Sequence, residues 1–197
     1  GPSGLMRFNL DYERPLKKSM KFKAGLQSDF GDNRDDQDSY AYSDSLGAYE
    51  RLDLFSTDVR YLQNVFAGYG IFSGEIKKLG YQIGLRGEYT DRDISITTGN
   101  LSTGVQRMDW FPSAHFSYQA DKKNQFMANA SRRIQRPRSW YLEPLNTLEE
   151  PLTVRTGNAD LLPEYIQSFE LGYIRNLEKR SFATELYFRN TNNIIER

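Results

Sequence analysis

The sequence contains no cysteine and a single histidine, His115. The absence of cysteine excludes disulfides and thiolate metal sites, and one histidine cannot form a multi-histidine metal site. No stretch approaches the roughly 18 consecutive apolar residues of a transmembrane helix, so a helical membrane span is excluded. The 26 basic and 26 acidic residues balance and form no basic block, so the chain has no electrostatic footprint for nucleic acid.

Aromatic residues, in contrast, make up 14% of the 197 residues, with 13 tyrosines and 12 phenylalanines. These side chains favour β-strands and interfaces. The mean hydropathy of −0.70 does not exclude a transmembrane β-barrel. Lipid-facing and lumen-facing residues alternate along the strands of such a barrel, and this alternation keeps the average hydropathy low.

Eight segments alternate between apolar and polar residues with a period of two, which is typical of a strand with one apolar and one wet face. The clearest alternation runs from Tyr81 to Tyr89. In residues 59–76, the odd-numbered positions from Val65 to Ile71 form the regular apolar side, whereas Phe66 and Phe72 interrupt the pattern and indicate a bulge or an interfacial zone. We therefore expect an all-β fold of about eight antiparallel strands in four hairpins.

The connections between these segments alternate in length. Every second connection is a charged turn of a few residues, whereas the others are long and polar, at residues 31–56, 91–104 and about 133–165. Short turns at one end of the strands and long loops at the other are typical of an outer-membrane barrel. A soluble antiparallel sandwich or lipocalin-like barrel is the alternative, but the length of the strands and the aromatic residues near the ends of the apolar face favour the membrane barrel.

Four short motifs follow one another in a specific order: Trp110 to Ser113 (WFPS), Ser131 to Pro137 (SRRIQRP), Leu142 to Leu145 (LEPL) and Thr156 to Glu164 (TGNADLLPE). With these motifs, the chain resembles the barrel of TonB-dependent outer-membrane receptors, in particular the Bacteroidetes-type outer-membrane β-barrel family. Ala159 stands where that family commonly has proline, and Leu162 where it usually has lysine. The resemblance implies a transmembrane barrel in a bacterial outer membrane that imports a nutrient such as a siderophore, haem or a glycan.

The resemblance also implies the partners of the barrel. The small-molecule or glycan substrate would bind the extracellular loops and the apex of a plug domain, and energy would come from TonB acting through that plug. The plug domain and TonB are expected to lie outside this chain, the lipid bilayer is a further partner, and no cofactor is implied. The alternative hypothesis is an independent eight-stranded structural or adhesive barrel without transport.

We interpret residues 1–4, Gly-Pro-Ser-Gly, as the remnant of a removed tag and residues 5–197 as an outer-membrane β-barrel segment without a plug domain. If the short turns face the periplasm, both chain ends lie on the extracellular side, and the chain ends in Ile-Ile-Glu-Arg rather than in an aromatic residue. The sequence therefore predicts eight strands taken from a barrel of about 22, or a small barrel closed by these eight strands alone.

The polar face of the predicted strands contains five residues that are candidates for facing the barrel lumen. They are Arg86, Glu88, Arg133, Glu170 and Glu185. Charged side chains on this face either contact a plug or a substrate, or pair with their neighbours across the strands as ordinary lumen charges. Both interpretations remain open, because alternation does not determine which residues of neighbouring strands lie opposite one another.

The longest loop contains the four candidate substrate contacts, Arg136, Trp140, Tyr141 and Asn158. The first three either hold a ligand by stacking and charge, or form an interfacial aromatic anchor with an arginine on lipid headgroups. Gly157 and Asn158 predict a turn that uses a positive φ angle, and Pro163 is expected to stiffen the return of the chain to the barrel.

No enzymatic activity is expected. His115 lies between Ser113 and Ser117 on one face of a strand, and positions two apart on a strand are separated by about 7 Å, which is too far for a hydrogen bond between a nucleophile and its base. The acidic stretch Asp32–Asp38 resembles a calcium loop in composition only, because it lacks the glycine and the terminal glutamate of an EF-hand. We therefore expect no metal site.

Overall fold

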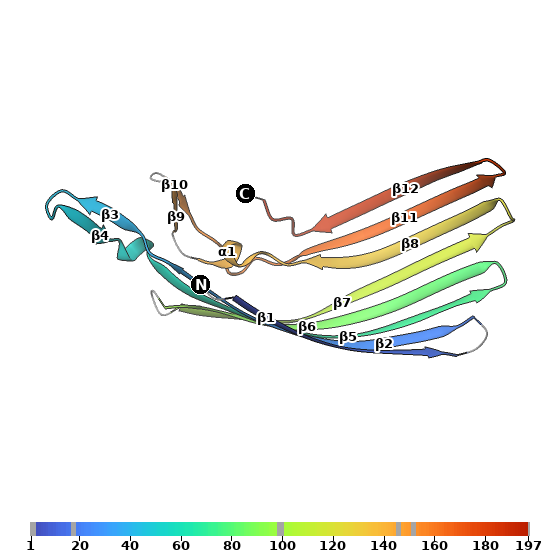
Figure 1. Cartoon of the computed structure of the whole chain (residues 1–197), viewed down its shortest axis with the longest axis horizontal. Helices are drawn as coiled ribbons and strands as arrows, with labels where there is room; N and C mark the ends of the chain where they lie inside the picture. Colours follow the sequence, from blue (N-terminus) through green and yellow to red (C-terminus); the bar gives the residue numbers. More distant parts are fainter. Residues whose placement is uncertain (1–2, 17–18, 98–100, 145–146, 151–152, 197) are drawn as a thin grey trace.

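The computed structural model describes residues 3–16, 19–97, 101–144, 147–150 and 153–196. Eight long strands form one antiparallel sheet in the order β1-β2-β5-β6-β7-β8-β11-β12 (Figure 1). Their bounds are Ser3–Pro15, Lys21–Gln37, Thr57–Ile76, Leu79–Ile96, Leu101–Gln119, Asn124–Gln135, Glu164–Leu177 and Arg180–Asn192. The prediction of an all-β fold with eight antiparallel strands is confirmed.

The sheet is open. Within the described residues, β1 pairs only with β2 and β12 pairs only with β11, so the first and last strands leave free edges. Figure 1 shows the eight strands as a curved wall, with both termini at the same end as the long connections. The predicted alternative of a small barrel closed by these eight strands is therefore not observed.

The long connections contain structure of their own. Between β2 and β5 lie the hairpin of β3 and β4, at Tyr40–Ser43 and Ala48–Arg51, and a 3-10 helix at Asp53–Phe55. Between β8 and β11 lie α1 at Ser139–Leu142 and the hairpin of β9 and β10, at Thr147–Glu150 and Thr153–Arg155. None of the helices in the described part of the chain has the length and apolar character needed to cross a bilayer.

The register gives the sheet an apolar face and a polar face. Residues directly opposite each other on neighbouring strands lie on the same face. Pairs such as Leu10 with Leu26 and Phe169 with Phe188 place large apolar side chains together on one face, where all four are at least half exposed. A continuous apolar surface of this extent requires an apolar surrounding rather than water.

The apolar face ends at one level toward the long connections. Asp91 of β6 pairs with Asn64 of β5 and with Gln106 of β7, so three neighbouring strands become polar at the same height. Beyond this level, Arg60 and Asp32 form an ion pair of 2.7 Å on the same outward face. About ten residues of each strand remain within the apolar band, which is the length that crosses the hydrocarbon core at the usual strand tilt.

The structure corrects the predicted assignment of faces in β5. The pairing of β5 with both of its neighbours is continuous, so this strand contains no bulge. Phe66 and Phe72 lie on the apolar face and are 42% and 38% exposed, whereas Val65 and Ala67 face the opposite side and are each 7% exposed. The sequence pattern was misleading because the residues between the two phenylalanines on the apolar face are glycines.

Two predicted loops are shorter than expected. β6 continues to Ile96 and pairs there with Leu101 of β7, so most of residues 91–104 are strand. β2 likewise continues to Gln37, where it pairs with Thr57 of β5. Above the apolar band the alternation is inverted. Acidic residues there lie on the face that is apolar within the band, and apolar residues lie on the opposite face. The backbone pairing continues through this change, which the sequence pattern had suggested to be the end of the strands.

The apolar core lies on the polar face, above the band. Val59, Ile94, Ile96 and Leu142 form a cluster in which every residue is 0–2% exposed, and Leu161 packs against it. Leu142 and Leu161 come from the loop between β8 and β11, which was predicted to be irregular. The loop therefore folds onto the polar face of β5 and β6, and complete burial of the Leu142 side chain contributes about 2 kcal/mol to this docking.

Candidate functional site

A chain of hydrogen bonds and ion pairs crosses the polar face of β1, β2 and β6. Arg7 donates to Asp29 at 2.7 and 2.9 Å, and the side-chain amide of Gln27 donates to the same carboxylate. Arg86 donates to Gln27 at 3.1 Å and to Glu88 at 2.6 Å. The candidate lumen residues Arg86 and Glu88 therefore belong to one network that is extended laterally along the wall.

Arg136 joins this network from the loop. Its Nη2 donates to Glu88 Oε2 at 2.6 Å and to Thr90 Oγ1 at 3.1 Å, so both carboxylate oxygens of Glu88 are bonded to arginine. Glu88 is 8% exposed, and charge-assisted bonds of this length are among the stronger ones in proteins. The structure therefore places Arg136 on the polar face of the barrel wall, where it fixes the start of the loop, and not on the apolar face.

The remaining lumen candidates gather on the polar face of β8, β11 and β12. Arg133 and Glu170 line one hollow of about 210 Å³ together with His115. Glu170 and Glu185 line a neighbouring hollow of about 310 Å³. Glu170 accepts a hydrogen bond from Asn129 at 3.1 Å, and Asn129 also bonds to the ring of His115. In the part of the chain that the structure describes, no ion pair joins Arg133 to either glutamate.

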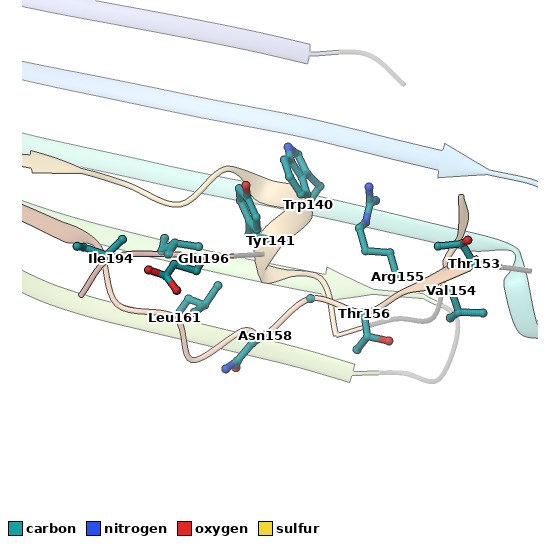
Figure 2. A pocket seen from close by; sticks show the side chains of 12 residues that line it. Trp140, Tyr141, Thr153, Val154, Arg155, Thr156, Asn158, Leu161, Ile194 and Glu196 are labelled. Atoms are coloured by element: carbon teal, nitrogen blue, oxygen red, sulfur yellow. The ribbon is translucent and has the colours of Figure 1, made fainter. Parts of the chain in front are cut away.

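Three of the four loop candidates surround one pocket of about 730 Å³ (Figure 2). Trp140 and Tyr141 of α1 are stacked, with ring centroids 3.7 Å apart and an angle of 26° between the rings. The guanidinium of Arg155 lies 5.1 Å from the centroid of the Trp140 ring, within the range of a cation–π interaction. Asn158 also lines the pocket, although Figure 2 shows its side chain pointing away from the aromatic pair. Arg136 does not line it.

The predicted turn begins one residue later, at Asn158, and the reason for glycine at position 157 differs from the expected one. The amide of Gly157 donates to the carbonyl oxygen of Glu143 at 2.8 Å, and the amide of Asn158 donates to that of Tyr141 at 2.7 Å. Gly157 does not have a positive φ angle. A Cβ atom at this position would instead lie 2.5 Å from the Glu143 oxygen and 2.8 Å from the Tyr141 oxygen. Glycine is therefore required by the close approach of two backbone segments.

Asn158 stabilises the same turn with its side chain. Its Oδ1 accepts a hydrogen bond from the amide of Asp160 at 2.9 Å, and its carbonyl accepts one from Leu161 at 3.3 Å. This is the local side-chain bond that makes asparagine frequent in turns. The position of Leu161 in the buried cluster thus depends on this turn.

Glu143 is the half-buried acid of this loop. Burial raises the pKa of its carboxyl, the negative charge of Asp35 raises the pKa further, and the positive charge of Arg155 lowers it. Glu143 directly follows α1, and its backbone oxygen accepts the hydrogen bond from Gly157. Ionisation of this carboxyl therefore opposes the docking of the segment that forms the pocket.

A comparison with known protein families assigns all eight strands of the sheet to one family. Residues 3–197 match the model of the outer membrane protein beta-barrel family. The chain belongs to this family. No curated protein matches the chain.

Membership of this outer-membrane family places the chain in the bacterial outer membrane. The apolar face of the wall then contacts lipid, and the polar face is turned to the barrel interior. Barrels of this membrane have short periplasmic turns and longer extracellular loops. The pocket of α1 and β10 accordingly lies on the extracellular side of this outer-membrane wall.

Arg92 is a residue of this barrel wall that the sequence reasoning missed. It lies on the polar face of β6 and is 6% exposed. The signal in the sequence was the run Arg92, Ile94 and Ile96, which alternates with Asp91 and Asp93 and thus continues the strand pattern with inverted polarity. Because the polar character of residues 91–104 predicts a loop, the sequence alone gives no reason to place these three residues on one face.

Proposed function

We propose that this chain is the barrel wall of a TonB-dependent receptor that imports a scarce nutrient across the outer membrane. The observation that carries the proposal is the combination of an unclosed eight-stranded wall with a loop that folds onto its polar side and forms a pocket. A closed eight-stranded barrel fills its interior with its own side chains or holds one small ligand. A wall that remains open after eight strands suits a much wider barrel, which has room for a plug domain.

The charges on the polar face support a partner in the lumen. The hollow lined by Arg133 and Glu170 and the hollow lined by Glu170 and Glu185 present charged groups toward the interior. Arg133 and Glu185 are exposed and Glu170 is half-buried in this wall, and any domain that covered these charges would have to pair or hydrogen-bond them. A plug domain that meets these hollows would supply such partners, and TonB would act on the barrel through that plug.

The pocket above the wall suits a substrate with a flat or ring-shaped part. The stacked rings of Trp140 and Tyr141 offer an aromatic surface, and Arg155 adds a positive charge beside it. Aromatic surfaces with a few polar groups are typical of small-molecule sites. We propose that the siderophore, haem, glycan or similar nutrient makes its first contacts here.

Uptake by cells tests this function. We expect deletion of the gene to abolish uptake of one nutrient from a panel of iron and glycan sources, and we expect a protonophore to have the same effect on wild-type cells. The gene restores uptake, whereas the double variant Trp140→Ala, Tyr141→Ala restores little at limiting substrate. The matched control, Tyr40→Ala with Tyr42→Ala on β3, restores it fully. Unchanged uptake of every nutrient after deletion would contradict the import function.

The adhesive alternative is favoured by one specific observation. The hairpin of β3 and β4 extends beyond the wall, and its side chains Tyr40, Tyr42 and Tyr49 are 57%, 56% and 72% exposed (Figure 1). Exposed tyrosines supply contact area at low entropic cost in binding loops. If the hairpin is an adhesive element, removal of residues 40–51 reduces attachment of cells to a surface while uptake of every nutrient stays unchanged.

A further inference from the structure

Arg92 is a buried cation without a carboxylate partner among the described residues. Its Nη2 donates to the carbonyl oxygen of Ala159 at 3.3 Å. Its Nε is buried and has no hydrogen-bond partner in the described part of the chain. The guanidinium of Arg92 interacts with the hydroxyl of Tyr61. A neutral phenol, however, does not balance the positive charge. A buried charge without a counter-charge is strongly destabilising.

Two further arginines line the same small cavity as Arg92. They are Arg107 of β7 and Arg136 of the loop, and the cavity has a volume of about 20 Å³. Its walls also include Thr90 and Asp109 and are covered by the buried prolines at 137 and 163. The cavity lies where β7 and β8 separate, because the pairing of these strands stops at Ser113 and Ser131.

The two carboxylates near the cavity are already occupied. Glu88 accepts from both Arg86 and Arg136 at 2.6 Å. Asp109 accepts from the Tyr165 hydroxyl, and its second oxygen lies 4.0 Å from Arg107. Three guanidinium groups, those of residues 92, 107 and 136, therefore face two carboxylates, and Glu88 is shared with Arg86. The local excess of positive charge requires a negative partner that these side chains do not supply.

We propose that this cavity binds a single monatomic anion, chloride in the cell, held by Arg92, Arg107 and Arg136. The volume of about 20 Å³ accommodates a species of about the size of water. It is too small for phosphate or sulfate. A water molecule in the same place would accept the hydrogen bond of the Arg92 Nε but would leave the excess charge unbalanced. The anion joins β6, β7 and the start of the loop at the point where the ladder of β7 and β8 ends.

Diffraction from crystals of the full chain grown in sodium bromide tests the site directly. We expect an anomalous difference peak within hydrogen-bonding distance of Arg92, and we expect this peak to disappear after exchange into gluconate. Density without an anomalous signal would mean that the cavity holds water only, and a carboxylate of another segment in this place would mean that the counter-charge is part of the protein. Either result overturns the proposal.

Thermal unfolding of the detergent-solubilised chain provides the second test. At constant ionic strength, replacing gluconate by chloride from ten-fold below to ten-fold above the dissociation constant should raise Tm by about 3–5 °C. This increase should be absent in Arg92→Met. The control variant Arg60→Met removes an arginine of the outward face and should keep the increase. An equal chloride response in Arg92→Met, or no response of the wild type, would refute the site. If Arg92→Met does not fold, the bromide experiment on the wild-type chain still shows whether the cavity holds an anion.

Discussion

The substitution Leu142→Ala should release the loop between β8 and β11 from the wall. Leu142 is 0% exposed, and it packs in the cluster of Val59, Ile94 and Ile96. Truncation of a fully buried leucine costs about 2–5 kcal/mol, because transfer energy is lost and a cavity remains. The cluster is formed between the loop and the strands, so the cost should fall on loop docking and leave the sheet intact.

Hydrogen exchange at two amides measures this docking. The amides of Gly157 and Asn158 donate to the backbone oxygens of Glu143 and Tyr141, and both bonds exist only in the folded loop. A loss of at least 2 kcal/mol should lower their protection by about 30-fold or more. Amides in the centre of β6 should keep the protection of the wild type.

The neighbouring substitution Leu162→Ala is the matched control. Leu162 belongs to the same loop but is 53% exposed, so its truncation should change the protection of these amides by less than about three-fold. Equal protection in wild type and Leu142→Ala would refute the docking of the loop onto β5 and β6. Equal losses in the two leucine variants would show that the buried cluster does not hold the loop.

Three further predictions follow from single positions. Burial and Asp35 raise the pKa of Glu143. The loop between β8 and β11 should therefore dock on the wall most strongly at a pH below 4.5, the ordinary pKa of glutamate, and docking should weaken as the pH rises through the raised pKa. Glu143→Gln should remove this dependence and increase the protection of the Asn158 amide at neutral pH; a dependence that persists would implicate another acid. Gly157→Ala should undock the loop at every pH, because its Cβ would meet a backbone oxygen at 2.5 Å, and limited proteolysis of the loop measures this; resistance equal to that of wild type would contradict the close approach. Phe72→Lys, nearer the middle of the apolar band, should destabilise membrane insertion by about 2–4 kcal/mol, measured by denaturant titration in lipid, whereas insertion unaffected by this charge would return Phe72 to the polar face.

The strands were predictable because each of them repeats a local signal. Alternation of apolar and polar residues in Phe8–Tyr12 or Phe182–Phe188 depends only on neighbouring positions, and the short charged turns mark the hairpins. The same rule failed at Phe66 and Phe72, where glycines occupy the lipid face. It also failed beyond Asp91, where the alternation continues with its polarity inverted.

The candidate site was only partly accessible to such reasoning. Trp140, Tyr141 and Asn158 were selected from their residue types and lie around one pocket. Arg136 was selected with them, but it is bound to Glu88, 48 positions away in the sequence. No local pattern reports such a contact, because it depends on where the loop folds.

Residue order alone thus specifies an outer-membrane wall of antiparallel strands, since the pleat of a strand converts a period of two directly into two faces. Folding of the whole chain decides where the long loop lies. The loop turns toward the polar face because Leu142 and Leu161 find Val59, Ile94 and Ile96 there, above the level of the lipid. The same folding brings Arg92, Arg107 and Arg136 around one cavity, and none of these three residues is close to another in the sequence.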